Sequence, residues 1–527
     1  MPTFNFKRDQ HALRRSLLPL VLVTCLVGRA QAQTAVWTAQ YDQGRTAANL
    51  GETILNTSNV NTSQFGLLFT RAVDGLIYAQ PLYVPSVTIK GVSSNVVYVA
   101  TMNNSVYAFD ADKAANSTPL WHVNLGPALN TADGNTYIGP QIGILSTPVI
   151  DVATKTMYVV SLTVVNGNSV YSLHALDITS GSEKFKGPVA IQGSVPGTAI
   201  DSRNGILTFS PANVLQRPAL ALFESAVVIG FGAFSEGYLF HGWLMSYNAS
   251  TLTQTGIVCT TPDGTRGGLW MSGRGIASDI HGMYFMVGNG TTGGSDLSST
   301  FVRLGGSSFD AFIPSNYKSL DKYDWDLNAG GPLLLPNTNL ILGAGKTGTI
   351  FLLDRTNLGG LVPGNTQVVQ SWQATKGCAD VAGEGCDEIH HYAYWYLAPG
   401  QPRLYLWALN ETLKAYAFNG STFDTTPVAK TSVVANFPGG QLAISADGGT
   451  TGTGIVWAAM SVQDASVGPV PGILRAFDAV SLTELWNSNM KSADNAGLLA
   501  KFCLPTIANG KVYLATFSNQ LNVYGLE

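Results

Sequence analysis

The sequence predicts an all-β protein, an eight-bladed β-propeller of four-stranded antiparallel blades that is closed by a strand from near the N-terminus. A unit of two apolar runs, separated by a turn rich in Asn, Gly or Asp, occurs eight times along the chain. Alternating runs of this kind, with almost no helical periodicity, are typical of antiparallel strands. One such sheet cannot bury both of its faces, so the repeated sheets must pack against each other around an axis.

The eight units account for most of the chain after residue 64. The first is NVVYVATMNNSVYAFDAD (95–112), and the others cover 155–181, 225–250, 282–306, 338–357, 402–421, 453–480 and 510–527. Short apolar segments such as AQPLYV and STPVI precede the units, and we interpret them as the first strand of each blade. Two smaller propellers or sandwiches would need a linker, and the sequence contains no visible one.

The last unit predicts how the ring closes. It runs out of chain after three strands, whereas FGLLFTRAV (65–73) lies before the first unit. We expect this segment to be the fourth strand of the last blade, which would join the two ends of the propeller.

Composition and charge exclude several classes of protein. Hydrophobic residues make up 45% of the 527 residues and charged residues 12%, with 57 glycines and a formal net charge of −4. The low charge and the many glycines fit an exported protein that is rich in strands and tight turns. They argue against a disordered chain and against a nucleic-acid partner, because there is no basic field for a polyanion.

The first 32 residues have the pattern of a cleaved export signal. Four basic residues between positions 7 and 15 precede the apolar run SLLPLVLVTCLVG, and the small-residue site Ala30-Gln31-Ala32 follows it. An uncleaved membrane anchor is the alternative, but the cleavage site is good and the apolar run is short for a bilayer. No other segment approaches the roughly 20 apolar residues of a spanning helix. We therefore expect a signal peptide over 1–32, an N-terminal extension over 33–64 and a single propeller over 65–527. The mature protein would be periplasmic or secreted, without a membrane span.

Four cysteines remain after removal of the signal. Cys378 and Cys386 bracket the loop ADVAGEG, and in an exported chain this arrangement predicts a disulfide. A zinc site is less favoured, because no second cysteine pair lies nearby. Cys259 and Cys503 could pair with each other or stay buried as small apolar residues.

The ends of the units resemble a known repeat. Tails such as AFDADKAANSTPLW and AFDAVSLTELW are similar to the pyrroloquinoline-quinone (PQQ) repeat, in which an aspartate turn and a tryptophan lock adjacent blades. The resemblance covers nearly the whole mature chain and implies a quinoprotein-like propeller. Propellers with this repeat include both quinone-dependent dehydrogenases and cofactor-free scaffolds, so the fold does not decide the function.

A second resemblance concerns a possible active site. YDWDLNAGGPLLL and the following LILGAGKTGTIFLLDRTN are similar to the region of quinoprotein alcohol dehydrogenases where a tryptophan-aspartate pair precedes a basic residue and an LDRT strand end. The resemblance implies that Asp326 is the catalytic base and a calcium ligand, and that Lys346 lies beside the quinone carbonyls. It also implies that Asn289, in MVGNG, binds the calcium and that Trp270, in GGLWMSGRG, is the floor on which PQQ stacks.

These roles are chemically consistent with one another. A hard cation held by carboxylate and amide oxygens polarises a quinone carbonyl. A carboxylate removes the proton of the alcohol while hydride passes to the quinone, and a lysine stabilises the developing negative charge. The chain contains no C-x-x-C-H haem motif, so the electrons would go to an external acceptor.

Other positions depart from the family's pattern. The chain has no vicinal cysteine pair, and the apolar run QIGILSTPVI replaces the arginine expected after that pair. The serine and threonine that bind the quinone carboxylates are replaced near Phe231 and Leu215. In GFGAFSEGY only Glu236, displaced by two or more residues, could serve as the metal-binding glutamate. The resemblance therefore covers the redox half of the site and not the half that binds the cofactor's acidic groups.

Each of these candidates also has an ordinary structural interpretation. Asp326 could cap a turn, Lys346 could be an exposed turn residue, Asn289 fits a hairpin and Trp270 fits a core position. The aromatic segment HHYAYWYLA (390–398) could line a sugar-binding channel, but core packing in an inner strand explains it as well.

The histidines suggest a different kind of site. His241, His281, His390 and His391 could converge at the axis, and neutral imidazoles bind zinc or copper. Their spacing matches no close ligand pattern, so the sequence does not favour such a cluster.

Two functions remain open from the sequence. The first is an exported quinoprotein-like oxidoreductase that oxidises a small alcohol or sugar with PQQ and calcium. The second is a cofactor-free propeller that holds a glycan or a protein ligand in its axial channel or on its loops.

Overall fold

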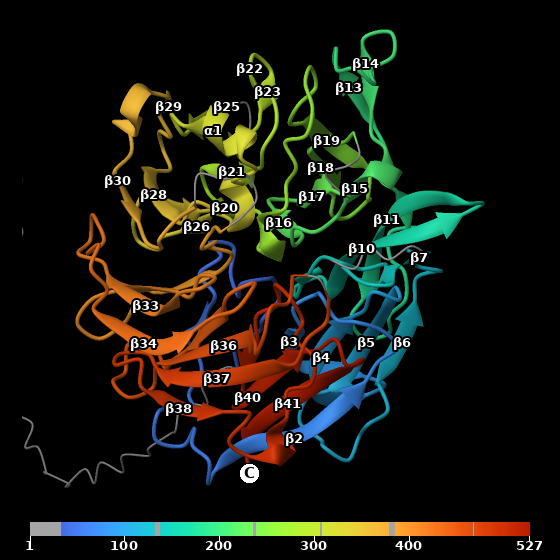
Figure 1. Ribbon diagram of the computed structural model, residues 1–527. Helices are drawn as coiled ribbons and strands as arrows, with labels where there is room; N and C mark the ends of the chain where they lie inside the picture. Colours follow the sequence, from blue (N-terminus) through green and yellow to red (C-terminus); the bar gives the residue numbers. More distant parts are fainter. Residues whose placement is uncertain (1–32, 132–137, 235–238, 306–307, 379–384, 467) are drawn as a thin grey trace, which may run out of the picture. The chain divides into compact units, whose positions relative to one another are not determined.

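The computed structural model describes residues 33–131, 138–234, 239–305, 308–378, 385–466 and 468–527. In this part of the chain the expected fold is confirmed, because eight mostly antiparallel sheets form an eight-bladed β-propeller. Figure 1 shows the sheets following one another around the ring in sequence order. The export signal expected over 1–32 lies outside the described residues. Among the described residues, no helix is long and apolar enough to cross a membrane.

Each blade consists of four or five strands that pair mainly in sequence order. Blade 1 contains β3 (Leu82–Ile89), β4 (Val92–Ala100), β5 (Ser105–Asp110) and β6 (Trp121–Asn124), and blade 2 contains β9 (Val149–Asp151), β10 (Thr156–Val165), β11 (Asn168–Asp177) and β12 (Val189–Ala190). Blade 3 contains β15 (Val214–Leu215), β16 (Ala221–Phe223), β17 (Ala226–Ala233), β18 (Trp243–Asn248) and β19 (Gln254–Cys259). Blade 4 contains β20 (Ala277–Asp279), β21 (Gly282–Val287), β24 (Thr300–Gly305), β25 (Ser308–Ile313) and β29 (Gly360–Leu361).

The remaining blades complete the ring. Blade 5 contains β26 (Leu333–Leu334), β27 (Leu340–Ala344), β28 (Thr349–Asp354) and β30 (Gln370–Gln373), and blade 6 contains β31 (Tyr392–Trp395), β32 (Arg403–Leu406), β33 (Thr412–Ala417) and β34 (Ala429–Val434). Blade 7 contains β1 (Ala48–Asn49), β35 (Gln441–Ser445), β36 (Ile455–Ser461), β37 (Gly472–Asp478) and β38 (Glu484–Asn487). Blade 8 contains β39 (Thr506–Ala508), β40 (Lys511–Ala515), β41 (Gln520–Leu526) and β2 (Phe65–Ala72).

Short elements lie outside the blades. They are the strand pairs β7 (Leu129–Asn130) with β8 (Gln141–Ile142), β13 (Ser194–Pro196) with β14 (Ile206–Thr208), and β22 (Thr292–Gly293) with β23 (Asp296–Leu297); the helix α1 (Tyr317–Lys322); and the 3₁₀ turns η1 (Pro211–Asn213), η2 (Met271–Gly273), η3 (Leu327–Ala329), η4 (Pro363–Asn365) and η5 (Ser492–Asp494).

The ring closes as the sequence predicts. Strand β2 pairs antiparallel with β41, from Phe65 opposite Leu526 to Ala72 opposite Gln520. The last blade therefore combines one strand from near the N-terminus with the three C-terminal strands, which ties the two ends of the propeller together.

The tail of the first repeat locks neighbouring blades in the expected way. The indole of Trp121, at the start of β6, donates a hydrogen bond of 2.9 Å to the carbonyl of Ile178 in the next blade. That carbonyl belongs to the turn after Asp177, whose carboxylate accepts the N–H of Thr179 at 2.7 Å. The aspartate shapes the turn and the tryptophan of the preceding blade docks on it.

Residues 36–49 were expected only as part of an extension, but they lie along the innermost strands of the ring. Main-chain hydrogen bonds of 2.8–3.0 Å join this segment to blades 1, 2, 4, 5, 6 and 7 at Tyr83, Ile150, Ser278, Leu334, Tyr394 and Ile444. Two side chains reach the other blades, since Gln43 donates to Leu222 O in blade 3 and Asn49 donates to Ile507 O in blade 8. A stretch of 14 residues can contact all eight inner strands only at the centre of the ring.

The cysteines adopt one of the expected arrangements. Cys378 and Cys386 form the predicted disulfide. Cys259 and Cys503 are both buried and unpaired. Burial raises the pKa of both thiols to about 12, so they behave as small apolar side chains.

Candidate active site

Three side chains singled out by the sequence lie together at the junction of blades 4 and 5. Asn289 follows β21, Asp326 immediately precedes the turn η3 ahead of β26, and Lys346 follows β27. The Lys346 Nζ lies 2.8 Å from Asp326 Oδ2, and the main-chain N–H of Asn289 donates to Asp326 Oδ1 at 3.1 Å. The structure therefore brings these three residues into one cluster.

A fourth residue, Asp324, completes this cluster. Its Oδ2 and its carbonyl oxygen each lie 3.0 Å from Lys346 Nζ. Its Oδ1 accepts the side-chain amide of Asn289 at 3.2 Å. The lysine thus lies between two carboxylates, and the asparagine holds both of them.

The local main chain explains why this cluster forms. The N–H of Lys346 donates to the carbonyl of Asp326 at 3.0 Å, so the end of β27 lies directly against the start of η3. A Cβ at Gly345 would collide with the carbonyl oxygens of Asp326 and Leu327. The glycine in GAGK is therefore needed for this close approach.

The electrostatics keep Lys346 charged. Burial by itself lowers the pKa of its ammonium, but the carboxylates of Asp326, Asp324 and Glu388 outweigh burial and raise the pKa above its usual range. One ammonium thus faces two aspartates at contact distance, so the immediate cluster carries net negative charge.

The same residues offer an incomplete site for a divalent cation. Both oxygens of Asp326 already have partners, Asn289 N–H and Lys346 Nζ. Asn289 Oδ1 accepts a hydrogen bond of 3.4 Å from Ser299. Among the described residues, no group of three or more His, Cys, Asp or Glu side chains is placed to hold a metal ion. Glu236, the third expected ligand, lies outside the described residues.

Trp270 is connected to this cluster through two turns. It is half-buried and immediately precedes η2, whose Ser272 hydroxyl donates to Ala329 O in η3 at 2.5 Å. Asn328, which sequence reasoning did not select, reinforces the connection by donating to Gly268 O at 2.8 Å. The turn that carries Trp270 is therefore bonded directly to the turn that follows Asp326.

A second pair of polar side chains lies just ahead of β31 in blade 6. His390 Nε2 lies 2.9 Å from Glu388 Oε2, and His390 Nδ1 lies 3.0 Å from the carbonyl of Pro438. The His390 ring also packs edge-on against Phe437 and Phe502. Glu388 thus lies within electrostatic range of Lys346 and pairs with an imidazole held by aromatic rings.

The expected alternative of a histidine metal cluster receives no support from the partners of these rings. His241 pairs with Asp201 at 3.1 Å, His281 lies on an exposed turn, and His390 pairs with Glu388. The aromatic segment after His391 forms β31, whose four residues are fully buried. This segment is an inner strand with core packing, as one of the two interpretations predicted.

Blade 2 contains a serine–histidine–glutamate array. Ser161 Oγ lies 2.9 Å from His174 Nε2, and His174 Nδ1 lies 2.5 Å from Glu183 Oε1. Ser161 is completely buried within β10 and cannot meet a substrate. The array is a set of cross-strand hydrogen bonds, not a nucleophilic site.

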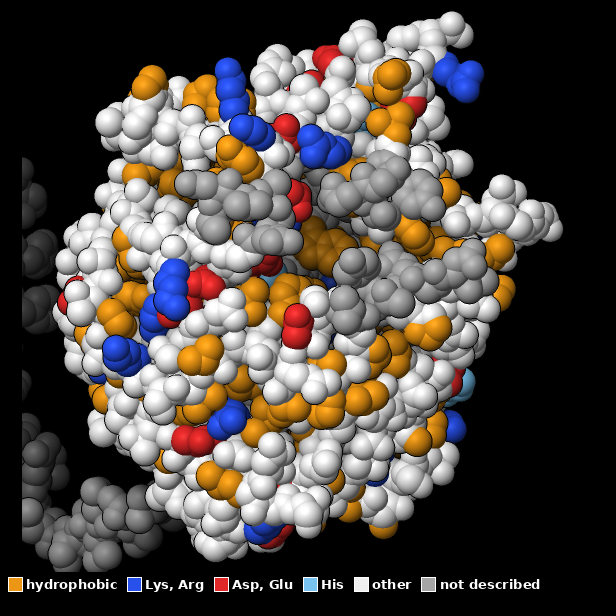
Figure 2. Space-filling model, viewed as in Figure 1, with side chains coloured by type: hydrophobic (Ala, Val, Ile, Leu, Met, Phe, Trp, Pro, Cys, Tyr) orange, Lys and Arg blue, Asp and Glu red, His pale blue; other side chains and the backbone are white. Residues whose placement is uncertain are grey.

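The surface shows where a ligand could approach. Figure 2 shows a hollow near the middle of the face that it presents, with hydrophobic side chains in its visible floor.

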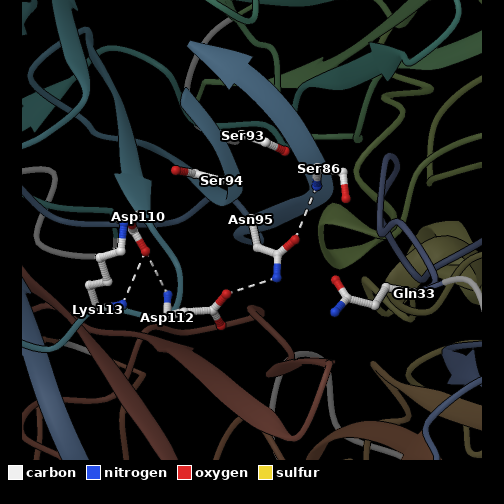
Figure 3. A pocket seen from close by; sticks show the side chains of 8 residues that line it. All are labelled: Gln33, Ser86, Ser93, Ser94, Asn95, Asp110, Asp112 and Lys113. Carbon is white, nitrogen blue, oxygen red and sulfur yellow. Dashed lines mark hydrogen bonds and ion pairs between the residues drawn. The ribbon is translucent and has the colours of Figure 1, made fainter. Parts of the chain in front are cut away.

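A separate polar pocket lies at blade 1, lined by Asn95, Asp110, Asp112 and neighbouring serines (Figure 3). Its acids are already bonded, because Asp110 accepts two turn N–H groups and Asp112 accepts the amide of Asn95. This pocket is a less promising site than the cluster at Asp326.

Sequence reasoning missed two buried arginines near the axis and considered His391 only as a metal ligand. Arg217 lies shortly before β16 and Arg274 shortly before β20, and each is at most 1% exposed. The segment LQRPAL looks like one more apolar strand start, so its arginine did not suggest a site. The usable signal was the charged residue itself, within an otherwise apolar segment ahead of a blade strand.

Comparisons with known proteins support the fold. No family model and no curated protein sequence matches the chain. Similar solved structures include the quinohemoprotein alcohol dehydrogenase ADHIIG from Pseudomonas putida HK5, at 13% identity over 94% of this chain and 80% of that chain, with a TM-score of 0.58.

Two further structures give the same picture. The quinohemoprotein alcohol dehydrogenase from Comamonas testosteroni is 14% identical over 93% of this chain and 80% of that chain, with a TM-score of 0.58. A europium-containing methanol dehydrogenase is 12% identical over 94% of this chain and 98% of that chain, with a TM-score of 0.55. At these identities the likeness shows the propeller fold that the chain shares with quinoprotein dehydrogenases.

Proposed function

We propose that this protein is an exported quinoprotein-type oxidoreductase that oxidises an alcohol or a sugar. The observation that carries the proposal is the convergence of Asn289, Asp326 and Lys346, with Lys346 Nζ 2.8 Å from Asp326 Oδ2. Asp326 can act as a base, the ammonium of Lys346 can stabilise negative charge, and Asn289 orients the base. The similar solved structures are themselves named alcohol and methanol dehydrogenases, which supports the same reaction class.

The described residues fit a quinone better than they fit a cation. Trp270 offers a half-buried ring on a turn bonded to η3, and Lys346 remains an ammonium. A calcium ion would have to displace Lys346 or Asn289 N–H from Asp326 and to recruit Glu236. We therefore assign PQQ to this site and expect calcium to bind weakly or to act by releasing the ion pair.

The chain's own groups would act as follows. A bound ortho-quinone supplies the hydride acceptor. Asp326, held by the N–H of Asn289, accepts the proton of the substrate hydroxyl. Lys346 would stabilise negative charge on a carbonyl oxygen of the quinone, and Asp324 keeps the lysine in place. An external acceptor takes the electrons, since no haem motif is present in the sequence.

The test uses the purified mature chain with PQQ, with and without calcium. Retained quinone is measured by its absorbance after desalting, and oxidation of primary alcohols and aldoses is followed with a redox dye. Asp326→Asn should retain the quinone and lose activity by about 100-fold or more, the usual size of a general-base contribution. Asp478→Asn, which removes a turn-capping carboxylate in blade 7, is the matched control and should stay active.

One observation favours the alternative function, a cofactor-free propeller that binds a glycan or protein. Lys346 forms ion pairs with both aspartates of the cluster, as a purely structural network would. If no quinone is retained at micromolar concentration, the protein belongs to this second class. If quinone is retained and Asp326→Asn is fully active, the base is another residue.

A further inference from the structure

Arg217 is a buried cation without an acidic partner in the described part of the chain. Its side chain is 1% exposed. Nη1 donates to Leu145 O at 3.4 Å and Nη2 to Phe502 O at 3.2 Å, while Nε has no partner. A guanidinium has five N–H donors, so most of its hydrogen-bonding capacity is unused. Burial lowers its pKa to about 10, which still leaves it charged at neutral pH.

His391 is a second unsatisfied group close to this guanidinium. It is 2% exposed, and neither ring nitrogen has a hydrogen-bond partner. The main chain of Ser272 lies beside the ring but satisfies neither nitrogen. Burial lowers the pKa of His391 well below its usual value, and the charges of Arg274, His390 and Arg217 lower it further. The ring is therefore neutral and offers one N–H donor at neutral pH.

The turn η2 joins these two groups. Gly273 lies against the Arg217 guanidinium so closely that a Cβ there would overlap it. Met271, Ser272 and Gly273 have φ angles of 50°, 45° and 78°, which is a strained run for the two residues that carry a side chain. Strain of this kind persists where the surroundings enforce it and is concentrated at ligand sites.

We propose that Arg217, the turn η2 and the neutral ring of His391 form an anion-binding site near the axis of the propeller. A buried guanidinium recognises a carboxylate or a similar oxyanion through charge-assisted hydrogen bonds. The anionic group has two possible sources, a free small anion or an acid group of the quinone cofactor. The second source rests on the proposed function, and Arg217 would then replace the arginine that the chain lacks at the usual position.

The experiment uses the mature chain with formate and PQQ as separate probes. Binding is measured by the shift of the thermal midpoint and by calorimetry, at constant ionic strength set with a bulky sulfonate. Arg217→Met and Arg217→Lys are compared with Arg403→Met, a control arginine that donates to main-chain carbonyls of Ala479 and Val480. We expect Arg217→Met to weaken anion binding by about 30-fold or more, the usual result of removing one partner of a buried charged pair, and Arg403→Met to leave it unchanged.

The outcomes separate this inference from the proposed function. If formate binds at Arg217 and competes with PQQ, an acid group of the cofactor occupies the site. If formate binds at Arg217 while PQQ does not bind or does not compete, the site takes a free anion, and the quinone proposal is judged by its own test. The anion site does not exist if PQQ binds Arg217→Met as tightly as the parent chain and formate shifts the thermal midpoint of no variant. It also does not exist if neither probe binds at all.

Discussion

Arg274 and Arg217 lie at comparable places in neighbouring blades, and both are completely buried, yet their surroundings differ. Arg274 donates to the carbonyls of Pro332, Tyr392 and Arg45, and its guanidinium lies 4.1 Å above the ring of Tyr392. Arg217 makes two long hydrogen bonds, leaves Nε without a partner, and lies 5.7 Å and 6.0 Å from the ring centroids of Tyr78 and Phe502. Burial lowers the pKa of both to about 10, so both remain charged.

The difference shows what burial of an arginine does and does not indicate. Arg274 joins blade 4 to blades 5 and 6 and to the N-terminal segment, so its charge is solvated by carbonyl groups of the fold itself. The two long hydrogen bonds and two distant ring contacts of Arg217 compensate for less of its desolvation. Arg274 therefore has a structural role, and the role that we propose for Arg217 is to bind an anion.

The largest expected effect is that of Arg274→Met on stability. The variant loses three hydrogen bonds to a charged donor and leaves three buried carbonyls without it, so the free energy of unfolding should fall by about 4 kcal/mol. Urea denaturation followed by fluorescence measures this change. Arg403→Met, at a partly exposed arginine, should cost about 1 kcal/mol or less. Equal losses in the two variants would contradict the structural role of Arg274.

Gly273→Ala tests how tightly the turn η2 packs against Arg217. The added Cβ would overlap the guanidinium and would sit at a φ of 78°, so we expect a loss of about 2 kcal/mol in the free energy of unfolding. Gly205→Ala is the matched control, because Gly205 has a φ of 74° with open space around it.

A double-mutant cycle sharpens this second test. In an Arg217→Ala background the overlap disappears, so Gly273→Ala should then cost no more than Gly205→Ala. An unchanged cost in that background would mean that strain in the turn, and not contact with Arg217, sets the effect.

The strand order and the cluster at Asp326 are the features that could be predicted from the sequence. Strands and their order follow from period-two alternation and Asn/Gly/Asp turns, and the closing strand 65–73 follows from the short last unit. Asn289, Asp326 and Lys346 came from the resemblance to quinoprotein alcohol dehydrogenases, and the strand ends that carry them are neighbours in space. Each of these signals can be read from the order and the local patterns of the sequence.

The missed features depend on contacts between distant residues. The segment 36–49 meets the inner strands through main-chain hydrogen bonds, which leave no side-chain pattern. Arg217 and Arg274 follow ordinary residues in LQRPAL and SGRGIA, and only the packed ring shows which guanidinium finds carbonyl partners. Glu236 remains an untested expectation, because it lies outside the described residues.

His391 should make the stability of the axis depend on pH. Its pKa in the folded state lies below the unfolded value because of burial and of Arg274, His390 and Arg217. The unfolded chain therefore binds the proton first as the pH falls, so stability is lost below the unfolded pKa of about 6.5. Between pH 6.5 and 5.5 this residue should account for about 1 kcal/mol of lost stability.

The comparison of His391→Gln with the parent chain isolates this contribution. The difference between their unfolding free energies should change by about 1 kcal/mol across that pH interval. His281→Gln, at an exposed turn, should leave the pH profile as it is. Parallel profiles for the parent chain and His391→Gln would show that the folded state protonates the ring as readily as the unfolded chain does.

The smallest expected effect is that of Arg217→Met in buffer without a small anion. Removing a buried charge with few partners removes the cost of its desolvation, and this gain offsets the two long hydrogen bonds that are lost. The free energy of unfolding should therefore stay within about 1 kcal/mol of the value for the parent chain or rise above it. In formate the order should reverse, because only the parent chain gains stability by binding the anion. If Arg217→Met instead loses about as much stability as Arg274→Met in both buffers, Arg217 is a second structural arginine, and the contrast between the two blades disappears.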